Sequence, residues 1–315
     1  MVKNYEDFRP GSSRIKRNGL VKMVWANFHT HCNLCDGIGN PGDYIEEAVN
    51  RHGMKILGFS SHASLPFETD WNMTKVTEEK YPLVIKQFKQ EYRDRINIKL
   101  GLEIDYIPGI AGTDMHGKKQ LMGLDYSIGS VHFIERYKSG AKAGEFIPID
   151  GKDTELEEGI KDTYNGNVRK AVETYYLILQ EMISRGGFDI IGHLDLIKKN
   201  NRNGKYFSED EKWYRDIVEK TLLVVSKSGL IVEVNTGGMS RNYTDSPYPS
   251  YWILERCLKL KIPITLNSDA HSPSHLTASF QQTAKALLEI GFKELHVFEE
   301  KSWEPRSFSP FGLIG

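Results

Sequence analysis

The sequence is poor in cysteine, in net charge and in long hydrophobic runs. Only three of its 315 residues are cysteines, an odd number that argues against a disulfide framework and favours a reducing, cytoplasmic location. Lys and Arg (41) nearly balance Asp and Glu (42), so the net charge of -1 gives no global attraction to nucleic acid or to an anionic membrane. No stretch approaches the roughly 20 apolar residues that span a bilayer, and we expect no membrane partner.

The N-terminal segment is polar and basic, with Arg9, Arg14, Lys16 and Arg17. It has no apolar core of signal-peptide length, so we do not expect secretion. We treat residues 1–22 as an N-terminal extension and 23–315 as a single domain, because no low-complexity linker divides the chain. The hydrophobic fraction of 39% and the aromatic fraction of 11% are typical of a globular protein.

Short apolar runs alternate with amphipathic helical patterns along the chain. Nearly continuous apolar runs suit parallel strands that are covered on both faces. The predicted strands are 24–30, 56–61, 98–104, 126–131, 189–192, 231–235 and 264–268, with a weaker eighth run at 295–299. Repeated strand–helix units predict one α/β barrel of parallel strands with right-handed crossovers. The least regular segment, 133–167, is predicted to be a long loop near the mouth of this barrel.

The histidines are concentrated at the ends of the predicted strands. Six of the ten lie at or just beyond a C-terminal strand end: His29, His31, His62, His132, His193 and His271. In a parallel barrel those ends meet at one mouth, where the active sites of such folds are built. The sequence therefore predicts a site that contains several imidazoles.

Two short motifs present metal-binding groups from one side of an extended segment. In the His-Thr-His segment 29–31, residues i and i+2 point to the same side, so both imidazoles can reach one ion. The Ser-Asp-Ala-His segment 268–271 presents a carboxylate and an imidazole in the same way. Asp36, in a turn before Gly37, can fold back as a further ligand, although by itself it reads as an ordinary turn residue.

Glu103 is an acid inside an apolar strand. A buried carboxylate requires a cation or several hydrogen bonds, and a carboxylate that bridges two metal ions meets this requirement. Each histidine or acid alone could be a hydrogen-bonded core residue, but the joint pattern favours a metal site. The nine candidate donors exceed the four to six ligands of one ion, so we expect two or three divalent ions. Mixed imidazole and carboxylate ligands suit Zn, Mn or Fe.

Cys32 and Cys35 form a C-x-x-C pair beside the first histidine motif. A thiolate zinc site or a redox pair is one interpretation. The chain has no second C-x-x-C, and Cys257 is far away in the sequence, so we interpret both cysteines as packing residues.

In their order and spacing, these segments resemble the polymerase-and-histidinol-phosphatase (PHP) superfamily, above all its histidinol-phosphatase branch. The matching segments are 29–31 with 35–37, 58–62, 101–106, 129–132, 192–195 and 268–271. The resemblance implies a distorted TIM-like (β/α)7 barrel with a trinuclear metal site at its C-terminal mouth. By motif matching, the ligands are His29, His31, Asp36, His62, Glu103, His132, His193, Asp269 and His271.

The resemblance also implies an activity, the hydrolysis of L-histidinol phosphate to L-histidinol and phosphate in histidine biosynthesis. A water that bridges the ions would attack phosphorus. Glu103, Asp36 and Asp269 would act through the metals, without a protein nucleophile. One departure from the family concerns Ser61, because many members have an aspartate immediately before the histidine matched by His62.

The substrate itself, a phosphate ester with a cationic amine, predicts further partners. Arginine fits phosphate geometry best, and the candidates are Arg241, after the strand end 233–238, and Arg169, at the start of a helix. Asp195, two residues beyond His193, is a candidate for the amine. Glu68 and Asp70 are others, in a loop with two aromatic residues. Any of these residues could instead have a surface or packing role.

Three other functions remain open from the sequence. A related phosphoesterase could act on nucleotides or nucleic-acid ends, although the balanced charge and the acidic stretch 153–162 disfavour nucleic acid. An amidohydrolase-type enzyme could cut C–N bonds on a similar barrel. A non-catalytic metal-binding interaction module is the alternative of another class, and the complete set of donors argues against it.

Overall fold

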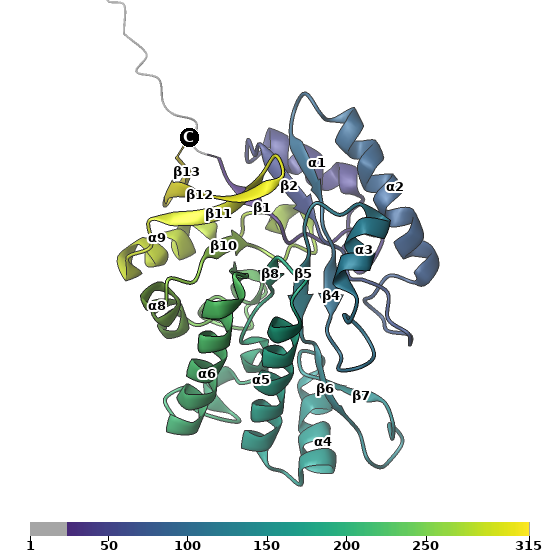
Figure 1. The fold of residues 1–315 in the computed structure, drawn as a ribbon, viewed down its shortest axis with the longest axis vertical. Helices are drawn as coiled ribbons and strands as arrows, with labels where there is room; N and C mark the ends of the chain where they lie inside the picture. Colours follow the sequence, from purple (N-terminus) through teal and green to yellow (C-terminus); the bar gives the residue numbers. More distant parts are fainter. Residues whose placement is uncertain (1–23, 315) are drawn as a thin grey trace, which may run out of the picture.

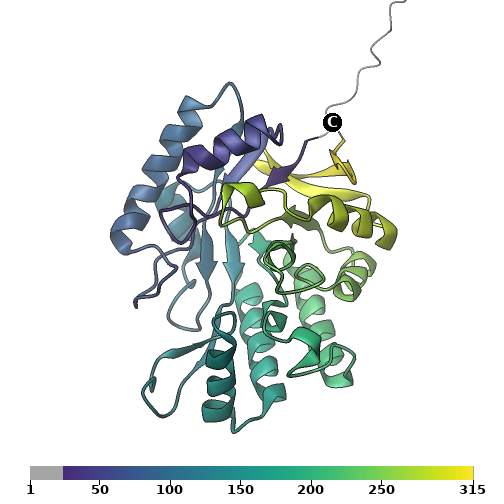
Figure 2. The same ribbon diagram turned by 180° about the vertical axis from the view of Figure 1, so that it is seen from behind.

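The computed structural model describes residues 24–314, so the predicted N-terminal extension, 1–22, lies outside the described residues. Strands gather at the centre and helices lie around them (Figures 1 and 2). The parallel strands are β1 (Ala26–Asn27), β2 (Ile56–Phe59), β3 (Asn97–Leu100), β4 (Glu103–Asp105), β5 (Ile128–Ser130), β8 (Ile190–Ile191), β9 (Ile231–Asn235) and β10 (Ile264–Asn267).

The parallel strands form two sheets that are connected at both edges. Their orders are β1-β2-β3 and β10-β9-β8-β5-β4. A parallel bridge between Thr30 and Ala270 connects the β1 and β10 edges, and a second bridge, between His62 and Glu103, connects β2 to β4. β3 and β4 follow each other directly along the chain and together occupy one strand position of the ring. The described residues therefore form a ring of seven strand positions: β1, β2, β3–β4, β5, β8, β9 and β10. The predicted distorted barrel fold is therefore confirmed.

A tyrosine fills the interior of this ring. Tyr126 is fully buried, and its hydroxyl donates a hydrogen bond to the carbonyl oxygen of Phe28, 2.5 Å away. A Cβ atom at Gly58 would lie only 2.3 Å from the Tyr126 hydroxyl oxygen, and one at Gly101 only 2.2 Å from the Tyr126 ring. Both neighbouring strands therefore require glycine at these positions, where the ring passes close to the backbone.

The helices cover the outside of the ring and have conventional signals at their ends. Asn40 caps the first one, because its side chain accepts hydrogen bonds from the backbone of Gly42 and Asp43, and Pro41 occupies the first turn. The helices are α1 (Pro41–Asn50), α2 (Lys75–Glu91), α3 (Met115–Met122), α4 (Asp153–Tyr164), α5 (Val168–Arg185), α6 (Lys212–Ser228), α7 (Gly237–Ser240), α8 (Tyr251–Lys259) and α9 (Phe280–Ile290). Short 3-10 turns occupy Leu196–Lys198, Arg202–Gly204 and Pro273–His275. No helix among residues 24–314 has the length and apolar composition to cross a membrane.

The weak eighth run is a strand, but it lies in a separate antiparallel sheet. β11 (Glu294–Glu299) pairs with β12 (Ser302–Ser309), which pairs with β13 (Gly312–Leu313). Phe298 and Trp303 pack against Tyr126 and Phe28. Figure 1 shows β11, β12 and β13 beside β1 and β2, on the other side of the barrel strands from α4 and the β6–β7 hairpin. This sheet therefore covers the end of the barrel opposite to the predicted site.

Segment 133–167 is more ordered than the predicted loop. It contains an antiparallel hairpin, β6 (Phe133–Arg136) with β7 (Phe146–Pro148), followed by α4. The hairpin is stabilised by distant aromatic residues, since Trp71 stacks on Phe133 with ring centroids 5.5 Å apart. Strands of three or four residues held by such long-range contacts leave little periodic signal in the sequence.

Candidate metal centre

The predicted ligands lie at the carboxyl ends of the parallel strands, in the layer where the two sheets connect. His62 and Glu103 form one of the connecting bridges, and Thr30 and Ala270 of the other are flanked by predicted ligands. The order along the chain is His29, His31 and Asp36 after β1, His62 after β2, Glu103 on β4, His132 after β5, His193 after β8, and Asp269 and His271 after β10. The fold therefore brings all nine together, as the sequence predicts.

Glu103 lies at the centre of this cluster and is only 1% exposed. Five imidazole nitrogens lie 2.9–3.7 Å from its carboxylate oxygens, those of His29, His31, His62, His132 and His193. The Ser130 hydroxyl donates a further hydrogen bond of 2.7 Å. Burial alone would raise the pKa of Glu103, but His29 and His62 hold it well below its usual range. Glu103 is therefore an ionised carboxylate shared by several imidazoles.

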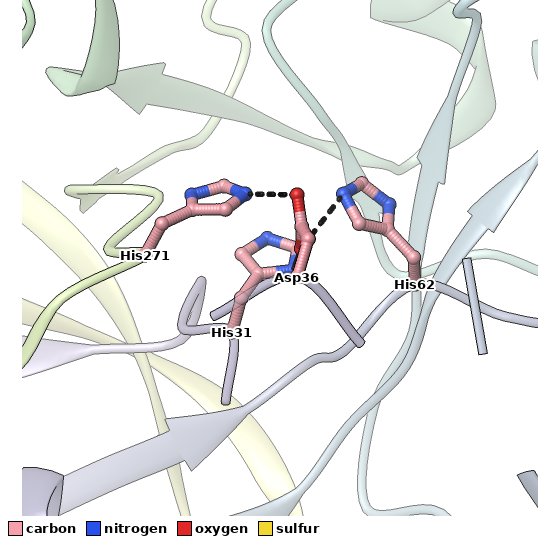
Figure 3. Close-up of side chains that lie close together, drawn as sticks. All are labelled: His31, Asp36, His62 and His271. Atoms are coloured by element: carbon pink, nitrogen blue, oxygen red, sulfur yellow. Dashed lines mark ion pairs between the residues drawn. The ribbon is translucent and has the colours of Figure 1, made fainter. Parts of the chain in front are cut away.

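The ligand atoms gather in four overlapping groups within 4.8 Å. Three of these groups consist of predicted ligands alone and define three positions for an ion, and the fourth joins His62 and His132 to Asp105. The first position is formed by His29, His31 and Glu103, with Asp269 Oδ1 lying 3.2 Å from His31 Nε2. The second position is formed by Glu103, His132 and His193. The third position is formed by Asp36, His62 and His271, with His31 beside them. Figure 3 shows Asp36 between His62 and His271 at this third position.

Several polar atoms of the cluster have the properties that a cation site requires. His31 Nε2, His62 Nδ1 and Asp36 Oδ1 are buried without a hydrogen-bond partner among the described residues. An unsatisfied buried polar group costs about 1–3 kcal/mol, and a bound cation removes this cost. Burial, together with the neighbouring His271 and His62, lowers the pKa of His31 to about 3. This imidazole is therefore neutral, which is the form that binds metal.

Two acidic partners of the cluster were not identified from the sequence. Glu233 on β9 is fully buried, and its Oε1 lies 2.6 Å from His29 Nδ1. Asp105 on β4 lies 2.6 Å from His132 Nδ1. Although burial lowers the pKa of His132, Asp105 raises it to about 10. Glu233 could have been found from the sequence in the same way as Glu103, because it too is an acid within a continuous apolar strand.

A cavity of about 310 Å³ lies over the cluster. Besides ligands, its lining includes Trp71, Asp150, Lys199, Arg241 and Tyr243. Arg241, one of the two arginines predicted as phosphate partners, is therefore among the lining residues. Its guanidinium is 3.2 Å from Asp269 Oδ2 and 3.2 Å from His271 Nδ1. Lys199 is a second cationic group in the lining, and Asp150 is a carboxylate outside the predicted ligand set.

Two predicted substrate residues do not line this cavity. Arg169 is on α5, with 59% of its side chain exposed, and pairs with Glu173 at 2.8 Å. Asp195 is fully buried, and its carboxylate lies 2.9 Å from the Lys198 ammonium. A buried carboxylate needs a nearby cation, and the turn that follows Asp195 supplies one. The alternatives Glu68 and Asp70 line a separate groove that shares Trp71 with the cavity.

The two cysteines of the C-x-x-C pair contact neighbouring side chains, with Cys32 buried and Cys35 partly buried. Cys32 is buried, with its sulfur 3.5 Å from the Ser61 hydroxyl, and Cys35 lies 3.6 Å from His31 Nδ1. Burial raises the pKa of the Cys35 thiol, and of the Cys257 thiol, to about 12. Neither thiol is therefore ionised near neutral pH.

We accordingly expect the native protein to resist alkylation. At pH 8, iodoacetamide should modify the three cysteines at least about 100-fold more slowly than a free thiol, because the thiolate is the reactive form. Mass spectrometry of timed samples measures the rate, and the same protein in denaturant provides the control. Rapid modification of Cys35 in the folded protein would contradict the packing interpretation.

Known proteins resemble this chain over most of its length. The PHP domain profile matches residues 27–237. The chain is 28% identical to a "Probable histidinol-phosphatase" of Deinococcus radiodurans, covering 88% of this chain and 97% of the relative. It is 27% identical to the histidinol-phosphatase of Bacillus subtilis, covering 80% of this chain and 96% of the relative.

Solved structures share the fold. A structure from Listeria monocytogenes matches with a TM-score of 0.72 at 21% identity, covering 82% of this chain and 99% of that one. The histidinol phosphate phosphatase of Lactococcus lactis, solved with zinc, L-histidinol and phosphate, matches with a TM-score of 0.62 at 21% identity. That match covers 93% of this chain and 99% of the other.

Proposed function

The chain belongs to the PHP domain family, and on this premise we propose that it is a metal-dependent phosphomonoesterase that hydrolyses L-histidinol phosphate to L-histidinol and phosphate. The observation that carries the proposal is the meeting of nine histidine and carboxylate side chains below a small cavity with two cationic groups. Relatives named histidinol-phosphatase align over nearly their whole length. A related structure holds both products of this reaction, with zinc.

The nine side chains would hold two or three divalent ions at the first, second and third positions. Imidazole and carboxylate donors suit Zn, Mn or Fe. Ions bound there would supply a water that ionises near neutral pH and positive charge for the phosphate oxygens. The described residues that line the cavity include no serine, threonine or cysteine, which agrees with a reaction that uses none of these three as its nucleophile.

The cavity walls offer partners for both ends of the substrate. Arg241 and Lys199 would bind the phosphate oxygens, with Arg241 held in place by Asp269. Asp150 is half-buried, and its Oδ2 lies 3.6 Å from the Lys199 ammonium. It would pair with the substrate ammonium, the role that the sequence suggests for Asp195. Trp71 and Tyr243 also line the cavity and would pack against the imidazole of the substrate.

The substrate is tested by comparing phosphate release from several esters. Metal-loaded protein is assayed with L-histidinol phosphate, p-nitrophenyl phosphate, a nucleoside monophosphate and a short 5′-phosphorylated oligonucleotide. We expect kcat/KM for histidinol phosphate to be at least about 100-fold higher, roughly 2.7 kcal/mol of transition-state discrimination. Equal rates with the generic esters would refute this substrate, and a preference for the nucleotide or oligonucleotide would favour the alternative phosphoesterase.

The phosphate partner is tested by substituting Arg241. In Arg241→Met, kcat/KM should fall about 100-fold, because hydrogen bonds to charged groups contribute about 1.5–3 kcal/mol. Arg169→Met is the matched control, since Arg169 is exposed and does not line the cavity. It should leave kcat/KM within about twofold. Equal losses in the two variants, or none in Arg241→Met, would contradict the assignment.

A further inference from the structure

One buried carboxylate near the proposed ions accepts hydrogen bonds on both oxygens. Glu233 Oε1 accepts from His29 Nδ1 at 2.6 Å and from the side-chain amide of Asn267 at 3.0 Å. Its Oε2 accepts from the His193 backbone N–H at 2.9 Å and from the side-chain amide of Asn235 at 3.0 Å. Four donors on one carboxylate leave no place for a proton or for an amide group. Glu233 is therefore a buried negative charge that fixes the ring orientation of His29.

Asp105 has the same relation to His132. Its Oδ1 lies 2.6 Å from His132 Nδ1, its Oδ2 accepts from the Asn72 amide at 3.2 Å, and the residue is 1% exposed. A carboxylate at Nδ1 leaves Nε2 as the donor atom toward the ion and makes the imidazole a stronger ligand. His29 Nε2 indeed lies 3.0 Å from Glu103, and His132 Nε2 lies 3.7 Å from it.

Among the described residues, no carboxylate from outside the predicted ligand set pairs with a histidine of the third position. The carboxylates nearest to the Nδ1 atoms there are themselves predicted ligands, since Glu103 lies 3.1 Å from His62 Nδ1 and Asp269 Oδ1 lies 3.4 Å from His271 Nδ1. His271 Nδ1 faces the Asp269 carbonyl oxygen at 3.0 Å and the Arg241 guanidinium at 3.2 Å.

Two ligands of the third position, which Figure 3 shows, are also more accessible to water than the shared carboxylate of the first and second positions. The side chains of Asp36 and His271 are 27% and 24% exposed, whereas that of Glu103 is 1% exposed. A cation at this position is therefore less shielded from water, and the Arg241 charge beside its ligand His271 repels it. Arg241 also pairs with Asp269 of the first position, but that position has the buried Glu233 charge behind His29.

We propose that Glu233 and Asp105 are positioning residues that make the three positions unequal, so that the first and second hold their ions tightly and the third holds an exchangeable ion that phosphate retains. A phosphate group bound against Arg241 would cancel the repelling charge and add oxygen ligands at the exposed side. The inference rests on the proposed function only for the presence of a metal centre. It goes beyond that function in assigning an order of affinity and two residues that set it.

The first experiment counts ions. Zinc-loaded protein is passed through a desalting column into metal-free buffer, with or without excess inorganic phosphate, and zinc is measured by mass spectrometry. We expect about two ions per chain without phosphate and about three with it, because the third ion and the anion stabilise each other's binding. Arg241→Met should retain the third ion without phosphate, and phosphate should no longer change the count.

The second experiment tests the two positioning residues through metal affinity. Competition with a chelator should show that Glu233→Gln and Asp105→Asn each lower the affinity of a tightly held ion by about 10- to 100-fold. Glu219→Gln is the control, since Glu219 forms a partly exposed pair with Arg256 on α6 and α8. It should not change the affinity. If Glu233→Gln does not fold, as judged by circular dichroism, Asp105→Asn and Arg241→Met still decide the question.

The inference is overturned if all three ions are lost together, if the third is retained equally without phosphate, or if the two variants match Glu219→Gln. Those results with undiminished hydrolysis of histidinol phosphate would leave the proposed function intact. A protein that binds no divalent metal would instead refute the proposed function itself.

Discussion

Glu103→Gln should lower kcat/KM for histidinol phosphate by at least about 1,000-fold, roughly 4 kcal/mol of transition-state stabilisation. Glu103 contributes to both the first and the second position, and five imidazole nitrogens lie within 3.7 Å of its carboxylate. The amide has no charge and turns an N–H group toward these nitrogens. Both positions are therefore weakened by one change of nearly constant volume.

Activity and metal content are measured on the same Glu103→Gln sample. We expect the loss of activity to accompany a loss of bound metal, because in the proposed metal centre the shared carboxylate would hold two ions at once. Glu219→Gln again serves as the control for replacing a glutamate elsewhere on the barrel. Near-normal hydrolysis by Glu103→Gln would show that this carboxylate is not part of the catalytic centre.

Asp195→Ala should destabilise the protein by about 3–5 kcal/mol, because it leaves a buried ammonium without its counterion. The Lys198 side chain is 4% exposed, and its Nζ lies 2.9 Å from Asp195 and 2.8 Å from the Pro247 carbonyl oxygen. Asp195 also accepts a hydrogen bond from the Ser250 backbone at 2.9 Å. The pair therefore connects the turn after β8 to the start of α8.

Urea denaturation measures the free energy of unfolding of this variant. The double variant Asp195→Leu with Lys198→Met should recover much of the loss, since an apolar pair of similar volume needs no counterion. The measurement also decides between two roles for Asp195. A rise in KM without a loss of stability would mean that Asp195 binds the substrate amine, against the structure.

Most of the nine clustered side chains could be predicted from sequence by two simple rules, whereas Asp36, which by itself reads as a turn residue, is included through the family resemblance. Imidazoles and acids at strand ends are conspicuous against apolar runs, and parallel strands bring those ends together. The strands themselves are shorter than predicted, as β8 has two residues where 189–192 is predicted. The chain bends away at the ligands, with φ angles of 21° at His193 and 50° at Asp269, which are uncommon for such residues.

The substrate partners could not be predicted in the same way. Asp195 and Asp150 are both acids near the mouth, and only the packing of distant segments decides which one lines the cavity. Asp195 is followed by the 3-10 turn Leu196–Lys198, which places a lysine on its carboxylate. Asp150 follows β7, in the irregular segment whose fold depends on contacts with Trp71 and Lys199.

Glu233 illustrates a different limit. A buried acid in the apolar strand β9 is visible in the sequence, and it requires a cation or hydrogen bonds. Whether such an acid binds an ion or supports a ligand depends on which imidazole nitrogen it faces. That distinction required the position of His29 Nδ1, 2.6 Å from Glu233.

The most direct test of the metal-centre account is anomalous diffraction from crystals of the protein soaked with zinc and phosphate. The account predicts strong peaks at the first and second positions, a third peak between Asp36, His62 and His271, and phosphate against Arg241 and Lys199. Peaks only at surface histidines, with none near Glu103, would contradict it.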